Sequence, residues 1–263
     1  MNAIVSIAKT TVGEAIRRRV LLVILLIGVL FLVVAPGLSV LTARQSYTVL
    51  TSFTLGVIQL TSAVIAIVLT VYLIPNEIER RTIYTILSKP VQRWQFLVGK
   101  FLGAVAALAL MMTLMTVTMG LVFMIMRQGS GMEALGGLFR VPLMFFVQMS
   151  LLAAVAVFFS TFVSPIVNFF LSGGVYLVGT FFNPLFDTFS KNENLPAIVK
   201  GSATIIHMIV PNFANFNVQN QVINPGAVIT NEATYYLQLV AYAVFYVLVF
   251  LIGGILVFDR REV

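Results

Sequence analysis

Long apolar runs alternate with short polar intervals along almost the whole chain. As a helix, a run of about 20 apolar residues is long enough to cross the roughly 30 Å hydrocarbon core of a bilayer. Six runs of this kind predict six transmembrane helices, at about residues 20–41, 53–74, 96–126, 141–159, 166–182 and 233–258. The pattern therefore predicts an all-α polytopic membrane protein with a single transmembrane domain over residues 1–263.

The residues before the first run and before the last run predict two further elements. Residues 2–19 place apolar side chains near one helical face and charged side chains elsewhere, which is typical of an amphipathic helix lying in the membrane interface. A signal peptide is the alternative, but its basic cluster would come unusually late, at residues 17–19. Residues 183–232 contain one apolar piece, at 198–210, that is too short and polar to span the membrane, which predicts a re-entrant or interfacial outer loop.

The interval at residues 75–95 is strongly charged although it lies between two long apolar runs. A charged residue at the bilayer centre would cost roughly 2.5–3.5 kcal/mol, so this interval must lie in water or at the membrane surface. Apolar and charged residues recur here on opposite sides of a helix that Pro90 would end. The apolar set is Ile78, Ile83, Ile86 and Leu87, and the charged set is Glu77, Glu79, Arg80 and Arg81. We therefore expect a short amphipathic helix that a cytoplasmic partner can contact.

The composition excludes a soluble enzyme domain. The chain is 60% hydrophobic and 10% charged, with a mean hydropathy of +1.03, far outside the range of soluble domains. It contains no cysteine, which excludes disulfides and thiolate metal sites. In such a membrane protein the net charge of +7 does not indicate nucleic acid, and its distribution matters more than its size.

Lys and Arg residues are concentrated on one predicted side of the membrane. If the N-terminus is cytoplasmic, that side carries 11 of the 16 and the other side carries the remaining 5. An excess of basic residues marks the cytoplasmic face, so both termini and the 75–95 interval are predicted to be cytoplasmic. The first set is Lys9, Arg17, Arg18, Arg19, Arg80, Arg81, Lys89, Arg93, Lys100, Arg260 and Arg261, and the second is Arg44, Arg127, Arg140, Lys191 and Lys200.

The sequence offers little chemistry of its own. No ionisable residue lies in the middle of a predicted span, where a coupled carrier needs one, and no nucleophile with a base or metal cluster indicates an enzyme. The only histidine, His207, is expected to be an ordinary loop residue, and Trp94 an interfacial anchor. Gly99 and Lys100 are followed by Phe101, so they do not form a phosphate-binding loop. We expect no catalytic, cofactor or metal site in this chain, and energy for transport must come from another chain.

Polar and methionine residues inside the spans leave alternatives open. Gln59, Gln148 and Asn168 are interpreted as interhelical hydrogen-bonding groups rather than ligand contacts. Six of the eleven methionines lie in the third span, and three of these, Met111, Met115 and Met119, share one helical face. Thioethers can select Cu(I), but methionine also fills irregular apolar gaps, and no His or Cys lies beside these residues.

Three motifs in and after the polar interval resemble the signature of type-2 ABC exporter permeases. They are EIERRTI at residues 77–83, LSKPVQR at 87–93 and GKFLG at 99–103. The six-span layout, the Pro and Asn residues at 211–217 and the basic C-terminus are similar to that family too. The resemblance implies a membrane subunit that dimerises, expected to be a homodimer in the inner membrane, and that binds two soluble ABC ATPase subunits holding ATP and Mg²⁺.

The resemblance also implies that residues 77–88 form a coupling helix, seated in a groove of the ATPase. The residues expected to make or support this contact are Glu77, Ile78, Glu79, Arg80, Arg81, Thr82, Ile83, Leu87, Lys89 and Pro90. The charges at this segment could instead anchor a loop at anionic lipid headgroups. The apolar spans indicate a hydrophobic or amphipathic cargo without identifying it. Two other functions remain open from the residues alone: a membrane anchor that docks a cytoplasmic partner on its basic face, and a secondary carrier.

Overall fold

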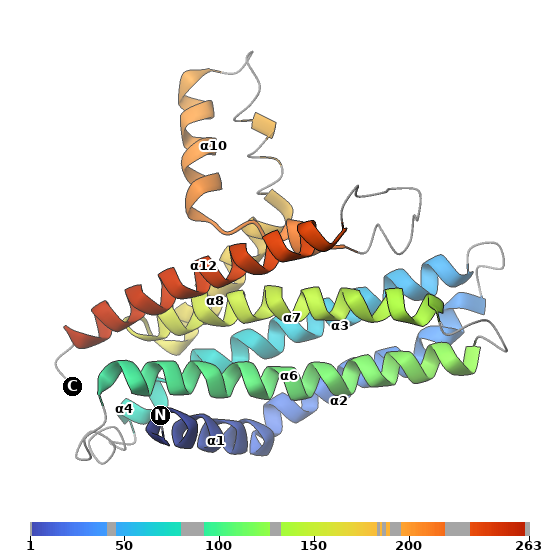
Figure 1. Cartoon of the computed structure of the whole chain (residues 1–263), viewed down its shortest axis with the longest axis horizontal. Coiled ribbons are helices and arrows are strands. Elements are labelled where there is room, and N and C mark those ends of the chain that lie inside the picture. The colour runs from blue at the N-terminus through green and yellow to red at the C-terminus, as the bar shows by residue number, and fades with distance from the viewer. Residues whose placement is uncertain are drawn as a thin grey trace.

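The protein consists of a helical bundle with one helix projecting from it (Figure 1). The structure is a computed structural model that describes residues 2–40, 46–79, 92–126, 133–182, 185, 188–189, 196–218 and 232–260. These residues form helices and turns and contain no strand. Within them, six helices are long and apolar enough to cross a membrane, which confirms the predicted all-α polytopic fold.

The helices follow the apolar runs but extend beyond the predicted spans at several ends, because a helix continues into the polar interface where the hydrocarbon stops. For example, α7 begins at Glu133, eight residues before the span predicted at 141–159. The long helices are α1 (Asn2–Arg17), α2 (Arg19–Val40), α3 (Ser46–Val71), α6 (Arg93–Met126), α7 (Glu133–Ser160), α8 (Pro165–Leu177), α10 (Ala197–Ile209) and α12 (Glu232–Asp259). The short ones are α4 (Pro75–Glu79), the π-helix η1 (Val178–Phe182) and the 3₁₀ turn η2 (Ala214–Phe216).

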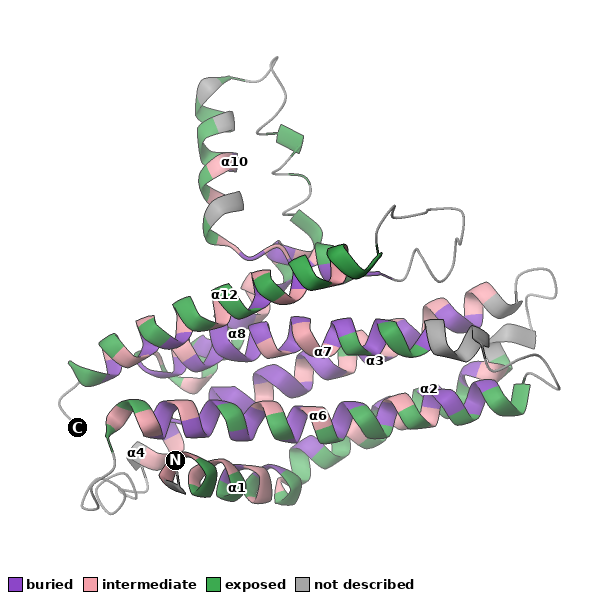
Figure 2. Ribbon diagram, viewed as in Figure 1, coloured by how far each residue is buried: buried purple, intermediate pink, exposed green. Residues whose placement is uncertain are grey.

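Helices α3 and α7 form the centre of the bundle. In the apolar stretch of α3, 61% of the residues are buried, and in that of α7 72%, against 28% in α2, 22% in α8 and 17% in α12. Figure 2 shows the same contrast, with buried residues following α7 and exposed residues following α12. Since lipid tails are as apolar as Leu, the exposed faces of α2, α8 and α12 are stable in a bilayer and are available to lipid or to another protein.

Polar side chains inside the bundle bond to neighbouring helices. Asn168 on α8 donates to the carbonyl of Ala156 on α7 at 2.9 Å and accepts from the hydroxyl of Ser172 at 2.8 Å. Gln59 on α3 and Gln148 on α7 are also hydrogen-bonded to each other, at 3.4 Å. These contacts confirm the prediction that Asn168, Gln59 and Gln148 are interhelical groups.

Both chain ends lie at one end of the bundle, together with α1 and α4 (Figure 1). An even number of crossings places the two termini on the same side, so this arrangement follows from six spans. We call this end, formed by α1, α4, the beginning of α6 and the end of α12, the basic end. The polar interval predicted at 75–95 begins and ends there.

Candidate coupling site at the basic end

Two glycines on α6 allow α1 to lie unusually close to it. A Cβ added at Gly103 would lie 2.7 Å from the carbonyl oxygen of Ala8, and one added at Gly99 would lie 2.9 Å from the Cβ of Ile7. Any other residue at these positions would force the helices apart. The two outer residues of the GKFLG motif are therefore glycine because the interfacial helix α1 packs directly on the backbone of α6.

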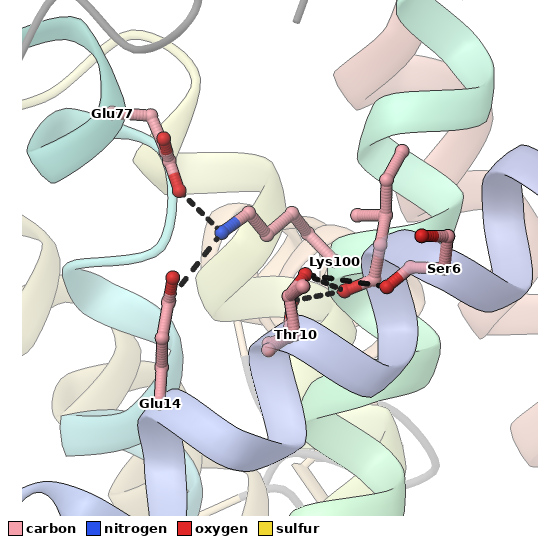
Figure 3. A network of polar contacts seen from close by, with 7 residues as sticks. Ser6, Thr10, Glu14, Glu77 and Lys100 are labelled. Atoms are coloured by element: carbon pink, nitrogen blue, oxygen red, sulfur yellow. Dashed lines mark hydrogen bonds and ion pairs between the residues drawn. The ribbon is translucent and has the colours of Figure 1, made fainter.

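Lys100 lies between these glycines and connects three elements of the basic end. Its ammonium nitrogen is 2.5 Å from Oε1 of Glu77 on α4 and 3.6 Å from Oε2 of Glu14 on α1 (Figure 3). It also lies 5.9 Å from the centre of the Phe96 ring. The group formed by Lys100, Glu77 and Glu14 is called the lysine node below.

Burial makes the two ion pairs of the lysine node unequal. The side chain of Lys100 is 4% exposed and that of Glu77 13%, whereas that of Glu14 is 52% exposed. Removing one partner of a buried pair leaves an uncompensated charge, at a cost of about 3–5 kcal/mol, while an exposed pair contributes about 0–1 kcal/mol. The contact of Lys100 with Glu77 therefore dominates, and it fastens α4 to α6.

Backbone contacts hold α4 in place beneath the end of α3. The amide of Glu77 donates to the carbonyl of Ile74 at 3.1 Å, and the amide of Asn76 donates to that of Tyr72 at 3.3 Å. Pro75 is buried and occupies the first helical position, where its missing N–H group costs nothing. The start of the polar interval is thus continuous with α3 and joined to α6 by the lysine node.

Arg93 fastens the other end of the interval. Its guanidinium donates to the carbonyls of Phe258 at 3.0 Å and Asp259 at 3.3 Å, and it lies 5.8 Å from the centre of the Phe258 ring. These are among the last carbonyls of α12, which have no partner within the helix. Phe96, one turn further along α6, stacks on Phe258 with ring centroids 6.2 Å apart. Both α4 and the beginning of α6 are therefore rigidly attached to the bundle.

The predicted coupling residues fall only partly within the described chain. Glu77 is placed in the lysine node, and Ile78 and Glu79 complete the backbone of α4. The others lie outside the described residues: Arg80, Arg81, Thr82, Ile83, Leu87, Lys89 and Pro90. The coupling helix predicted at 77–88 is thus described only as far as Glu79.

The sequence analysis missed two members of the lysine node. Lys100 was read as part of a motif and Glu14 as part of the charged face of α1, and neither was assigned to the site. The available signal was a single cation between two glycines, because a lysine on a face that another helix approaches this closely needs an anionic partner.

A second group of polar contacts lies away from the basic end, around residues 211–218. This segment belongs to the re-entrant or interfacial outer loop predicted at 183–232, and its Phe213 and Phe216 side chains are fully buried. Gly179 makes room for it, since a Cβ there would lie 2.4 Å from the carbonyl oxygen of Pro211. The segment therefore packs into the bundle against η1. We call residues 211–218 the buried turn.

Hydrogen bonds from three sides hold the buried turn. The amide of Gln148 on α7 donates to the carbonyl of Phe213 at 2.9 Å, and the Phe213 N–H donates to the carbonyl of Gly179 at 3.0 Å. From α12, the hydroxyl of Tyr242 accepts from the Asn212 N–H at 2.9 Å, and that of Tyr235 donates to the carbonyl of Asn215 at 2.8 Å. These bonds satisfy backbone N–H and C=O groups that cannot bond to water inside the bundle.

The methionine face of α6 lies in the hydrophobic core. Met111 is 4% exposed, and Met115 and Met119 are fully buried. Within the described part of the chain, no three His, Asp or Glu side chains come together in a way that could hold a metal ion. This packing favours the interpretation that the methionines fill the core.

Comparison with known proteins assigns the chain to a family. A family model described as ABC-2 family transporter protein matches residues 5–263. The match includes the lysine node, the buried turn and all six candidate membrane spans. A search of curated proteins gave no match.

Proposed function

Because the chain belongs to the ABC-2 family of transporter proteins and is a membrane permease of an ABC transporter, we propose that it works as a homodimer coupled through residues 77–88 to two soluble ABC ATPases. ATP and Mg²⁺ bind to those partner subunits, and this chain supplies the path across the membrane. We place the basic end in the cytoplasm and the protein in the inner membrane, in agreement with the distribution of Lys and Arg.

The lysine node is the observation that carries this proposal. A segment that receives a movement from a partner must be attached stiffly to the helices that it moves. Glu77 begins the proposed coupling segment, and its buried contact with Lys100 joins that segment to α6, while α3 leads directly into α4. Glu14 and the two glycines of α6 bring α1 into the same unit.

This arrangement gives a defined mechanical role to each element. Closure of the two ATPases around ATP moves the coupling segments of the two copies, and α1, α3 and α6 follow as a rigid body. Charged residues at 79–81 pair with charges on the ATPase, which sets orientation and rate of association more than affinity. The buried turn closes the path on the side of the bundle away from the basic end. The path opens there when the neutral hydrogen bonds of the buried turn break and are replaced by others.

Co-purification with the candidate ATPase tests this function directly. The variant Glu79→Ala/Arg80→Ala/Arg81→Ala changes only charges of the proposed contact, and Lys9→Ala on the exposed face of α1 is the control. We expect the unchanged protein and the control to bind the ATPase and alter its ATP hydrolysis in lipid. The triple variant should lose binding or lose the change in hydrolysis.

Two results would contradict the proposal. One is the absence of any ATPase complex, in which case a membrane anchor for another cytoplasmic partner becomes the better explanation. The other is a triple variant that binds and regulates the ATPase as the unchanged protein does, since the contact would then lie elsewhere on the basic end.

A further inference from the structure

A pocket at the basic end combines apolar walls with two arginines. It has a volume of about 520 Å³ and lies between α2, α3 and α8. Its walls come from the last turn of α3 and the first turns of α8, and include Val68, Phe169 and Phe170. Two of the described lining residues are charged, Arg18 and Arg19, which lie at the break between α1 and α2.

Three spans begin or end at this pocket, which places it at the level of the lipid headgroups of the proposed cytoplasmic leaflet. Arg19 begins α2, Tyr72 follows the last residue of α3, and Pro165 begins α8. The apolar wall is open to the surroundings, because Ile166 is 69% exposed and Phe170 is 71% exposed. An amphiphile in that leaflet can therefore enter from the side without crossing the hydrocarbon with its head.

Two other pockets formed by the described residues do not share this chemistry. One of about 440 Å³ between α6 and α7 and one of about 360 Å³ between α2 and α3 have no charged residue in their lining. Those surfaces suit acyl chains alone. Among the described residues, the lining of the pocket at the basic end includes two guanidinium groups and no carboxylate, and this charge is complementary to an anionic head.

We propose that this pocket binds an anionic phospholipid of the inner leaflet, and that this lipid is the class of cargo the protein moves. Its phosphate lies on Arg18 and Arg19, and the start of an acyl chain lies against α3 and α8. The guanidinium fork suits phosphate geometry, and the aromatic and aliphatic wall takes chain carbons out of contact with headgroup water. The assignment as cargo rests on the proposed function, whereas the binding site does not.

Lipid quenching of a single tryptophan tests the site in the full-length protein. The natural Trp94 is replaced by Phe, and Tyr72→Trp puts a reporter in the pocket lining. Nanodiscs contain brominated phosphatidylglycerol or brominated phosphatidylcholine as the quenching lipid. We expect quenching at position 72 to favour the anionic lipid by about thirtyfold in relative affinity, the scale set by two basic groups near a membrane surface.

Arginine variants then locate the interaction. Arg18→Gln/Arg19→Gln should reduce the preference to less than about twofold, and Arg19→Gln alone, at an exposed position that folding tolerates, to an intermediate value. Arg17→Gln is the matched control, since Arg17 is exposed on the same side but does not line the pocket. Three results would overturn the site. The two lipids could quench equally, neither could quench because a second copy covers the pocket, or Arg17→Gln could lose the lipid preference as fully as the double variant does.

The cargo assignment has its own measurement. In nanodiscs with the ATPase bound, unbrominated phosphatidylglycerol should raise ATP hydrolysis for the unchanged protein and for Arg17→Gln but not for the double variant. A lipid that binds at position 72 and leaves hydrolysis unchanged would overturn the assignment as cargo. The quenching experiment contains no ATPase, so a failure of the proposed function would not alter its result.

Discussion

The basic end and the buried turn are both held by polar contacts, but the contacts differ in kind. At the basic end a buried lysine pairs with two carboxylates, and Glu77 and Glu14 contribute from different helices. At the buried turn the side chains of Gln148, Tyr242 and Tyr235 bond to backbone groups, and none of these three contacts involves a charge. One region is tied by ions and the other by neutral hydrogen bonds.

The difference follows from position and suits two different tasks. Full charges are expensive within hydrocarbon, so an ion pair belongs at a helix end, where it makes a stiff joint. Hydrogen bonds within membranes contribute only about 0.6 kcal/mol each on average, because alternative partners are available. A joint that must transmit force is expected to be ionic, and a seal that must open is expected to be neutral.

The largest stability effect should come from breaking the buried ion pair. Lys100→Met should lower the free energy of unfolding by about 3 kcal/mol, because it removes the ammonium group that pairs with the carboxylate of Glu77, whose side chain is only 13% exposed. The midpoint of thermal unfolding in detergent measures this. Lys9→Met, at an exposed position of α1, is the control and should change the midpoint little. An equal midpoint for both variants would show that the lysine node does not stabilise the basic end.

Steric substitutions at the two close approaches should rank next. Gly103→Ala places a methyl group 2.7 Å from a backbone oxygen of α1, and Gly179→Ala places one 2.4 Å from a backbone oxygen of the buried turn. Overpacking of this kind costs about 1–3 kcal/mol. Gly13→Ala and Gly56→Ala have nothing within 4 Å and serve as controls, which should retain or slightly raise stability. The midpoint of thermal unfolding of the four variants measures this. Equal midpoints for the two close-approach variants and the two controls would contradict the close packing.

A smaller effect is expected from the neutral contact of Gln148. Gln148→Leu removes the donor to the carbonyl of Phe213, and because this leaves a buried acceptor without that donor, it should cost about 1–2 kcal/mol, more than an average membrane hydrogen bond contributes. Ser150→Ala on the same helix is the control, since that hydroxyl bonds only to the carbonyl of Phe146 within α7. If the buried turn is a seal, the Gln148 variant should also pass small solutes across liposomes without ATP. A tight membrane together with the expected loss of stability would show that the segment is structural only.

The smallest effect should come from the exposed arm of the lysine node. Glu14→Gln should change stability by less than about 1 kcal/mol, because the Glu14 side chain is 52% exposed and 3.6 Å from the ammonium group. Its effect should also shrink in high salt, whereas that of Glu77→Gln should persist. Thermal unfolding of both variants at low and high ionic strength separates the two arms. If Glu14→Gln lowered stability as much as Glu77→Gln, burial would not explain the strength of the two ion pairs of Lys100.

The sequence predicted the spans better than it predicted the contacts between them. Hydropathy identifies a helix that must satisfy its backbone in lipid, so six spans follow from six apolar runs. It does not identify the partners of Lys100, because Glu14 and Glu77 lie on other elements and are brought together by packing on Gly99 and Gly103.

The buried turn shows the same limit, because its sequence predicts a turn but not that the turn is buried. Pro and Asn at 211–217 favour turns, and a turn is present, but turn composition usually indicates a surface position. Phe213 is fully buried because Gln148 and Gly179 supply its backbone bonds and the space that it occupies. No local pattern contains this information.

The central claim is that the lysine node transmits the state of the ATPase along α6. The chain contains no cysteine, so Ile125→Cys, exposed at the far end of α6, can carry one spin label per copy without other changes. Pulsed electron spin resonance on the dimer with bound ATPase would compare the distance between the two labels with and without ATP. We predict an ATP-dependent change in the otherwise unchanged protein and its loss in Lys100→Met, with the ATPase still bound. The same ATP-dependent change in both proteins would contradict the claim.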